Sequence, residues 1–132
     1  MMTKEEKHTH VANLIKLAKA DKELVQDEVI FIKSIAIKIG VDSSDFNNIA
    51  LNLESVKEVT PVSREVKARQ FYDILTLMSI DQKADGEEEN LSRELGGKLG
   101  FSKDQVERAI TITKDNLEKV ITPEQIAEIV GA

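Results

Sequence analysis

The sequence predicts an all-α protein of about seven helices, built as two pseudo-symmetric three-helix repeats plus a C-terminal helix. The second half of the chain aligns with the first at an offset of sixty residues without a gap. Self-similarity at a fixed offset indicates one structural unit used twice. Apolar residues at helical spacing and residues typical of helix caps occur in both halves. Identical pairs include Leu17/Leu77, Asp21/Asp81, Glu28/Glu88, Lys38/Lys98 and Gly40/Gly100.

The length of 132 residues is enough for one domain with one continuous core, so we expect a single domain over 1–132. The first repeat is expected over about 5–53 and the second over about 63–117. The linker between them, about 54–62, has no apolar period. An extra helix over about 122–131 has no counterpart in the first half.

The first repeat opens with a capping box, in which Thr3 and Glu6 satisfy the first backbone amides of a helix. The next helix, from about 27 to 39, is rich in β-branched residues and on propensity alone resembles a buried strand. Its counterpart in the second repeat spaces leucines by four, which favours a helix for both. Gly40 then takes the place of a left-handed cap, and Asp42 or Ser43 can begin the third helix. The inward stripes of the first and third helices are Val11, Leu14, Ile15 and Ala18, and Phe46, Ile49, Ala50 and Leu53.

The second repeat carries the same signals. Ser63 can cap its first helix, Gly100 repeats the left-handed cap, and Ser102 begins a further capping box. Thr122, followed by a proline, is a strong start for the last helix. The inward stripes of its first and third helices are Phe71, Ile74, Leu75 and Met78, and Val106, Ala109, Ile110, Thr113 and Leu117.

A small residue occupies the same place in the second helix of each repeat, Ala36 in one and Gly96 in the other. Glycine inside a helix costs about 1 kcal/mol against alanine and needs a reason. One reason is a crossing of these two helices near the pseudo-axis. The other is simple tolerance of glycine in a well-packed helix.

Composition narrows the class of function. The chain carries a net charge of −6 and a pI near 5.0, which speaks against nucleic-acid binding and against attraction to an anionic membrane. It has no Cys, and so no disulfide, thiolate metal site or thiol nucleophile. No apolar run approaches the ~20 residues of a spanning helix. We expect a cytoplasmic protein whose ligands are cations or basic protein surfaces.

Two pairs of acids are the repeated polar feature that helix rules do not fully explain. Asp21 and Glu28 are seven residues apart, as are Asp81 and Glu88. A Glu in the first turn of a helix is favoured by the helix dipole, whereas an Asp at the end of the preceding helix faces its negative pole. Each Asp either bonds backbone amides of the turn or binds a divalent cation together with its Glu. Further acids lie nearby, namely Glu23, Asp27, Asp85, Glu87 and Glu89.

The second connection partly resembles the calcium loop of an EF-hand, with Asp81 first, Asp85 fifth and Gly86 sixth. Lys83 stands at the third position, where a cation repels calcium, and Ser92 stands where a bidentate Glu is needed. A true EF-hand is therefore not expected.

The pattern of Ala20-Asp21, Glu28 and Gly40, repeated as Ile80-Asp81, Glu88 and Gly100, resembles the TerB-like domain of tellurite-resistance proteins over about residues 5–115. The resemblance implies an all-helical, internally pseudo-symmetric fold in a bacterial stress-response setting. It also implies binding of a divalent metal ion, such as Ca²⁺, Mg²⁺ or Zn²⁺, at Asp21, Glu28, Asp81 and Glu88. The family often has Gly directly after the first Asp, where this chain has Lys22 and Gln82.

The sequence offers little support for a catalytic site or for a metal site built on histidine. The only histidines, His8 and His10, are expected on different faces of an N-terminal segment that frays, with no metal or catalytic role. Ile30 and Ile37 are interpreted as core residues, with a protein partner or homodimer contact as the alternative. We expect a non-enzymatic module that binds a divalent cation, a protein partner or both. A purely structural interaction domain without metal is the alternative, and a metal-assisted hydrolase is the least favoured.

Overall fold

The computed structural model describes residues 2–20, 25–80, 86–116 and 121–131. These residues form seven α-helices and one short 3₁₀ helix, with no strand among them, as the sequence predicts. No helix among the described residues is long and apolar enough to cross a membrane. The elements are α1 (Lys4–Lys19), α2 (Gln26–Ile39), α3 (Ser43–Leu51), η1 (Leu53–Ser55), α4 (Arg64–Ser79), α5 (Gly86–Lys98), α6 (Lys103–Asp115) and α7 (Pro123–Val130).

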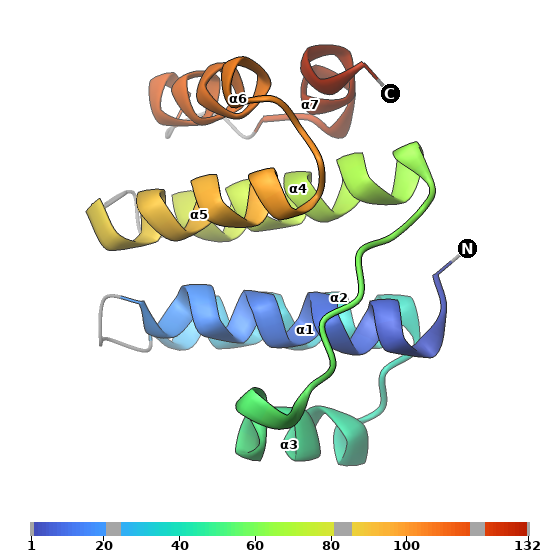
Figure 1. Cartoon of the computed structure of the whole chain (residues 1–132). Coiled ribbons are helices and arrows are strands. Elements are labelled where there is room, and N and C mark those ends of the chain that lie inside the picture. Colours follow the sequence, from blue (N-terminus) through green and yellow to red (C-terminus); the bar gives the residue numbers. More distant parts are fainter. Residues whose placement is uncertain (1, 21–24, 81–85, 117–120, 132) are drawn as a thin grey trace.

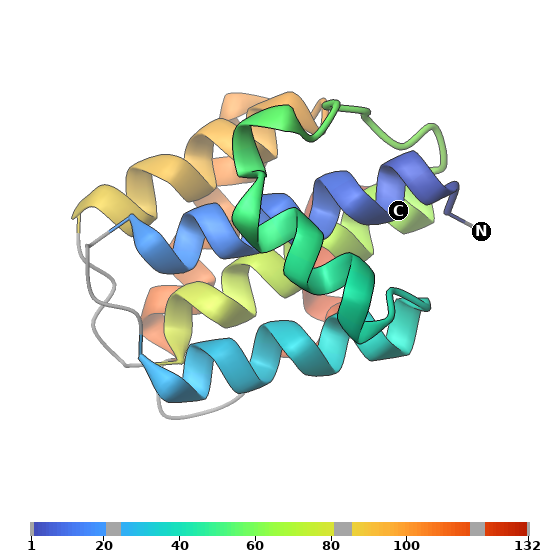
Figure 2. The same cartoon turned by 90° about the horizontal axis from the view of Figure 1, so that it is seen from below.

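The helices stack in layers around a central pair (Figure 1). Helices α1 and α2 form one layer, α4 and α5 the next, and α1 packs directly on α4. Helix α3 covers the first layer, and α6 and α7 cover the second. Seen from below, α2 and α5 lie on opposite sides of this pair (Figure 2). The repeat is visible in the bounds, because α1 and α4 begin and end at positions sixty residues apart.

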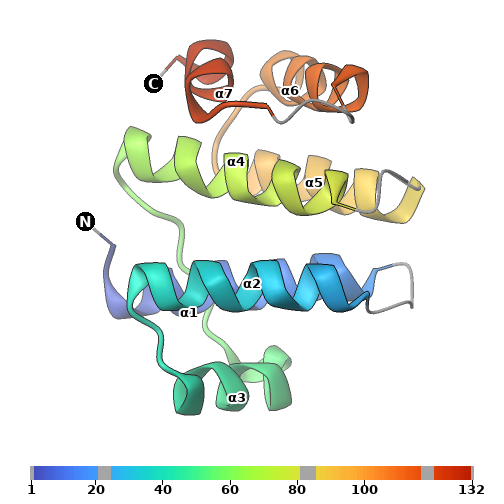
Figure 3. The ribbon, with the colours of Figure 1, turned by 180° about the vertical axis from the view of Figure 1, so that it is seen from behind.

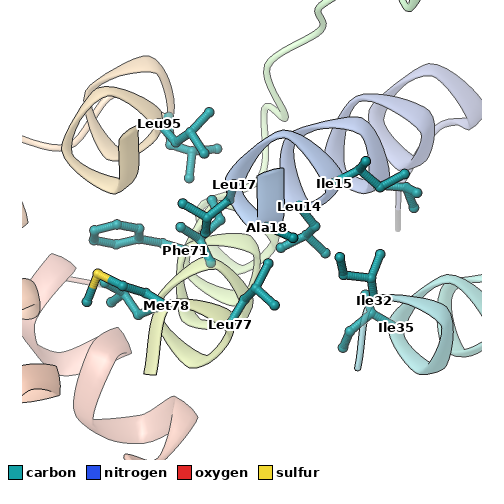
Figure 4. Close-up of a cluster of buried hydrophobic side chains, with 14 of the residues drawn as sticks. Leu14, Ile15, Leu17, Ala18, Ile32, Ile35, Phe71, Leu77, Met78 and Leu95 are labelled. Carbon is teal, nitrogen blue, oxygen red and sulfur yellow. The ribbon is translucent and has the colours of Figure 1, made fainter. Parts of the chain in front are cut away.

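The core is aliphatic and lies mostly along α1 and α4. Figure 4 shows Leu14, Leu17 and Ala18 of α1 between α2 and α4, facing Ile32 on one side and Leu77 on the other. One buried cluster draws residues from every α-helix. The predicted inward residues of α1 and α4 are all buried in it. Burial of a large aliphatic side chain contributes roughly 1.5–3 kcal/mol, so this stripe supplies much of the stability.

The predicted caps form as expected. Thr3, Ser102 and Thr122 each build a complete capping box, and the Ser63 side chain caps α4. Asp42, rather than Ser43, caps α3. Gly40 and Gly100 adopt left-handed conformations with φ of 90° and 96°, where side-chain-bearing residues are strained. The β-branched stretch of α2 is helical, so the repeat was the better guide than propensity.

The structure rules out one of the two explanations offered for Gly96, and it contradicts the interpretation of Ile30 and Ile37 as core residues. Helices α2 and α5 do not cross, because α1 and α4 separate them. A Cβ on Gly96 would instead lie 2.9 Å from Val106 of α6 and 3.0 Å from the ring of Phe71 of α4. Ile30 and Ile37 are not core residues, since they are 57% and 74% exposed on the outer side of α2.

Candidate functional site

Glu28 and Glu88 are buried, each with only 1% of its surface exposed. They occupy corresponding positions in the first turns of α2 and α5. A carboxylate is among the side chains least often found fully buried, because its charged form loses the solvation of water. The structure therefore shows what the sequence pattern alone did not indicate: both repeats bury a glutamate at the same position.

The first turns of α2 and α5 lie at the same end of the molecule, on the left in Figure 1, but not together. Figure 2 shows them on opposite sides of the central pair. The arrangement therefore favours two separate sites, one per repeat, over one site made from four acids. Asp21 and Asp81, the partners predicted from the sequence, lie outside the described residues.

The described part of the chain holds no group of three or more acids or histidines placed so that they could bind one metal ion together. Of each predicted pair of ligands, only the glutamate lies in the described part of the chain: Glu28 in the first pair and Glu88 in the second. Carboxylate oxygens suit hard cations, so the buried glutamates fit such an ion chemically. They also fit a purely structural role, because both are third in their helices, where the helix dipole and backbone amides favour a carboxylate.

Glu89, which follows Glu88, has a different role from the one its charge suggested. Its carboxylate bonds Arg93 within α5 and lies 3.1 Å from the Nζ of Lys114 in α6. Arg93 also donates to Glu107 of α6 at 2.7 Å. Partial burial alone would raise the pKa of Glu89, but the hydrogen bonds and charges of Lys114 and Arg93 hold it below the ordinary 4.5. Glu89 therefore ties α5 to α6 and adds little to the field around Glu88.

The lowered pKa predicts a pH-dependent contribution to stability. Glu89→Gln should lower the free energy of unfolding at pH 7 by about 1–2 kcal/mol, because Arg93 and Lys114 lose a negatively charged acceptor and one of its two oxygens. A carboxyl whose pKa is lowered by folding stabilises the protein above its unfolded pKa and loses that effect as pH falls through the folded value. Urea unfolding should therefore show a constant difference between variant and parent above about pH 5, shrinking in more acidic solution. Glu87→Gln, an exposed neighbour, should change stability by less than about 0.5 kcal/mol at any pH.

His10 and Asp73 form a buried polar pair between α1 and α4 that sequence reasoning missed. The two side chains are 1% and 5% exposed, and Nε2 of His10 lies 2.9 Å from Oδ2 of Asp73. A carboxylate accepts, so we assign the hydrogen to Nε2. Arg69 approaches the other carboxylate oxygen at 3.6 Å. The expectation that His10 belongs to a fraying segment is wrong, because α1 is closed by its capping box and packed on α4.

A signal for this pair was present in the sequence. Asp73 lies within the otherwise apolar stretch from Phe71 to Leu75, and His10 directly precedes the buried Val11. The corresponding residues of the other repeat are Asn13 and Gln70, which are also polar. Polar residues that recur at matching positions on a core-facing helix indicate a buried hydrogen-bonded site.

Comparison of the chain with protein families, with characterised proteins and with solved structures finds no match. The resemblance to TerB-like domains therefore stays a prediction based on the acidic pairs and their spacing.

Proposed function

We propose that this chain is a non-enzymatic, TerB-like module that binds one divalent cation in each repeat. Asp21 with Glu28, and Asp81 with Glu88, would supply the carboxylate ligands. When bound, the cation would neutralise the acids and join the end of one helix to the start of the next. The setting implied by the resemblance is a bacterial stress response, with tellurite resistance as one possibility within it.

The equal burial of Glu28 and Glu88 is the observation that carries this proposal. Carboxylate oxygens are the ligands that hard divalent cations prefer, and a bound cation would favour the charged form of a buried carboxylate. The two positions correspond through the repeat, and each follows an Asp by seven residues. Exposed acids directly before them, Asp27 and Glu87, show that burial is specific to this position rather than general to the helix start.

Isothermal titration with Ca²⁺, Mg²⁺ and Zn²⁺ tests the proposal. We expect one of these ions to bind with a stoichiometry of about two per chain, because each repeat would hold its own site. At a free concentration of one hundred times Kd, binding should stabilise the fold by about 2.7 kcal/mol per site in urea unfolding. Asp21→Asn or Asp81→Asn should halve the stoichiometry, and the double variant should abolish binding.

The exposed acids provide matched controls. Asp27→Asn and Glu87→Gln remove one charge each beside the candidate ligands and should leave the stoichiometry unchanged. If no ion gives heat, and Asp81→Asn changes stability equally with each cation and with a chelator, the cation proposal is wrong. Glu88→Gln, tested in the same way, checks whether the buried glutamate of the Asp81 and Glu88 pair takes part in cation binding.

The second candidate function is a protein-interaction domain without metal, and the exposure of Ile30 and Ile37 favours it. They are seven residues apart and share one side of α2. In that case the acids serve only helix caps and solubility, which corresponds to the negative result of the titration. A hydrolase is least favoured. Among the described residues lining the groove beside His10 and Asp73, none carries the hydroxyl or thiol that such a pair would activate.

A further inference from the structure

The linker between the repeats occupies a groove of the fold. It crosses α1 on its way from α3 to α4 (Figure 1), and its residues line a groove together with Leu95 of α5 and the adjoining Leu99. The Thr9 hydroxyl donates to the carbonyl of Lys57 at 2.8 Å and accepts from the amide of Val59 at 3.1 Å. The carboxylate of Glu58 lies 3.3 Å from the Nζ of Lys98. Pro61 is buried where the linker ends. The linker thus binds as an extended peptide, through its backbone, an ion pair and an apolar end.

The pseudo-symmetry of the fold creates a second groove, between α2 and α4. A cavity of about 390 Å³ lies there, against about 210 Å³ left beside the linker in the first groove. Figure 3 shows α2 and α4 from this side, with the linker behind them. Six positions line both grooves at the sixty-residue offset: His10/Gln70, Ile35/Leu95, Lys38/Lys98, Ile39/Leu99, Arg69/Thr9 and Asp73/Asn13.

Within the described ranges no extended segment like the linker lies in the second groove. Met2, which lines it, corresponds to Val62 at the end of the linker. Lys38, the counterpart of Lys98, is exposed and makes no ion pair within the described part of the chain. Arg69 adds a second cation, 47% exposed, at the place of Thr9. The floor is apolar, with the buried His10–Asp73 pair beside it.

The charged side chains that line the α2–α4 groove determine which kind of ligand it can bind. Helix α2 contributes Lys38, and α4 contributes Arg69 and the exposed Glu65. Asp73 is buried and already bonded to His10. Within the described part of the chain Lys38 makes no ion pair, whereas its counterpart Lys98 pairs with Glu58 of the linker.

We propose that the α2–α4 groove binds an extended segment of a partner protein. Its acidic side chain pairs with Lys38, and the apolar residues that follow lie on Ile35 and Ile39. The linker in the α1–α5 groove is the template for this mode of binding, because the two grooves share their positions. The site lies along α2 and α4 and uses none of the acids assigned to cation binding. The peptide-binding proposal is therefore independent of the cation proposal.

A nuclear magnetic resonance titration with a synthetic peptide tests this directly. The probe is the capped hexapeptide Val-Lys-Glu-Val-Thr-Pro, which copies residues 56–61. We expect binding with a Kd on the order of 0.1–1 mM, since a short flexible peptide pays an ordering entropy. Amide shifts should concentrate at Ile35, Lys38 and Ile39. The same peptide with Gln in place of Glu should bind about fivefold more weakly.

The repeat provides a matched pair of variants. Lys38→Glu should weaken binding about fivefold or more, whereas Lys98→Glu makes the same charge change in the linker groove and should leave binding unchanged. Three results would overturn the proposal. They are no shift at about ten times the expected Kd, shifts centred on Leu95 and Leu99, and self-association of the chain through the α2–α4 face in sedimentation without peptide.

Discussion

His10→Ala should lower the free energy of unfolding by about 3–5 kcal/mol, the largest effect we expect from a single substitution. The change removes the imidazole that lies 2.9 Å from the Asp73 carboxylate and leaves that carboxylate inside the protein. Arg69 is its nearest other charge, at 3.6 Å and from a half-exposed side chain, so it replaces only part of the lost interaction. Urea unfolding followed by circular dichroism measures the difference.

The repeat suggests the variant that separates hydrogen bonding from packing. His10→Gln introduces the residue found at the corresponding position, Gln70, and retains a donor for Asp73. It should lose less than half as much stability as His10→Ala. If the alanine variant does not fold, the stability of His10→Gln can still be measured. His8→Ala is the control, because His8 is on the same helix, 4.0 Å from Asp45 near the surface, and should lose less than about 1 kcal/mol. A loss below about 1 kcal/mol for His10→Ala would mean that the pair contributes little.

Helix positions could be predicted from the sequence because their determinants are local. Capping residues, apolar spacing and the left-handed Gly40 and Gly100 each act within a few residues of the chain. The repeat then resolved the one ambiguous segment, α2, because its counterpart must adopt the same fold. These signals fix where helices begin and end, which is what the structure confirms.

The contacts between helices could not be predicted in the same way. His10 and Asp73 are 63 residues apart, and only the packing of α1 on α4 brings them together. Exposure of Ile37 likewise depends on which side of α2 faces α1 and α4, which a helix with apolar residues on most of its faces does not disclose. For the acids, spacing indicated Glu28 and Glu88, but their burial came from tertiary structure.

Gly96→Ala should destabilise the protein by up to about 2 kcal/mol, even though alanine is the better helix former. The new Cβ would lie 2.9 Å from Cγ2 of Val106 and 3.0 Å from the ring of Phe71. Neither neighbour can move easily, because Val106 is β-branched and the Phe71 ring is fully buried and packed on Phe101 at 5.4 Å. Overpacking of about 1–3 kcal/mol thus outweighs a helix gain of about 1 kcal/mol.

The adjacent glycine makes this a controlled comparison. A Cβ on Gly97 meets nothing within 4 Å, so Gly97→Ala should stabilise the protein by about 0.5–1 kcal/mol. The two substitutions are chemically identical and one residue apart, and thermal unfolding should move in opposite directions for them. The first repeat has Ala36 and Val11 where the second has Gly96 and Phe71. The smaller residue, glycine, therefore occurs in the repeat whose neighbouring side chain is the large phenylalanine ring. In a Phe71→Val background, Gly96→Ala should therefore lose the part of its penalty that comes from the ring and keep the part that comes from Val106; an unchanged penalty there would place the whole clash at Val106.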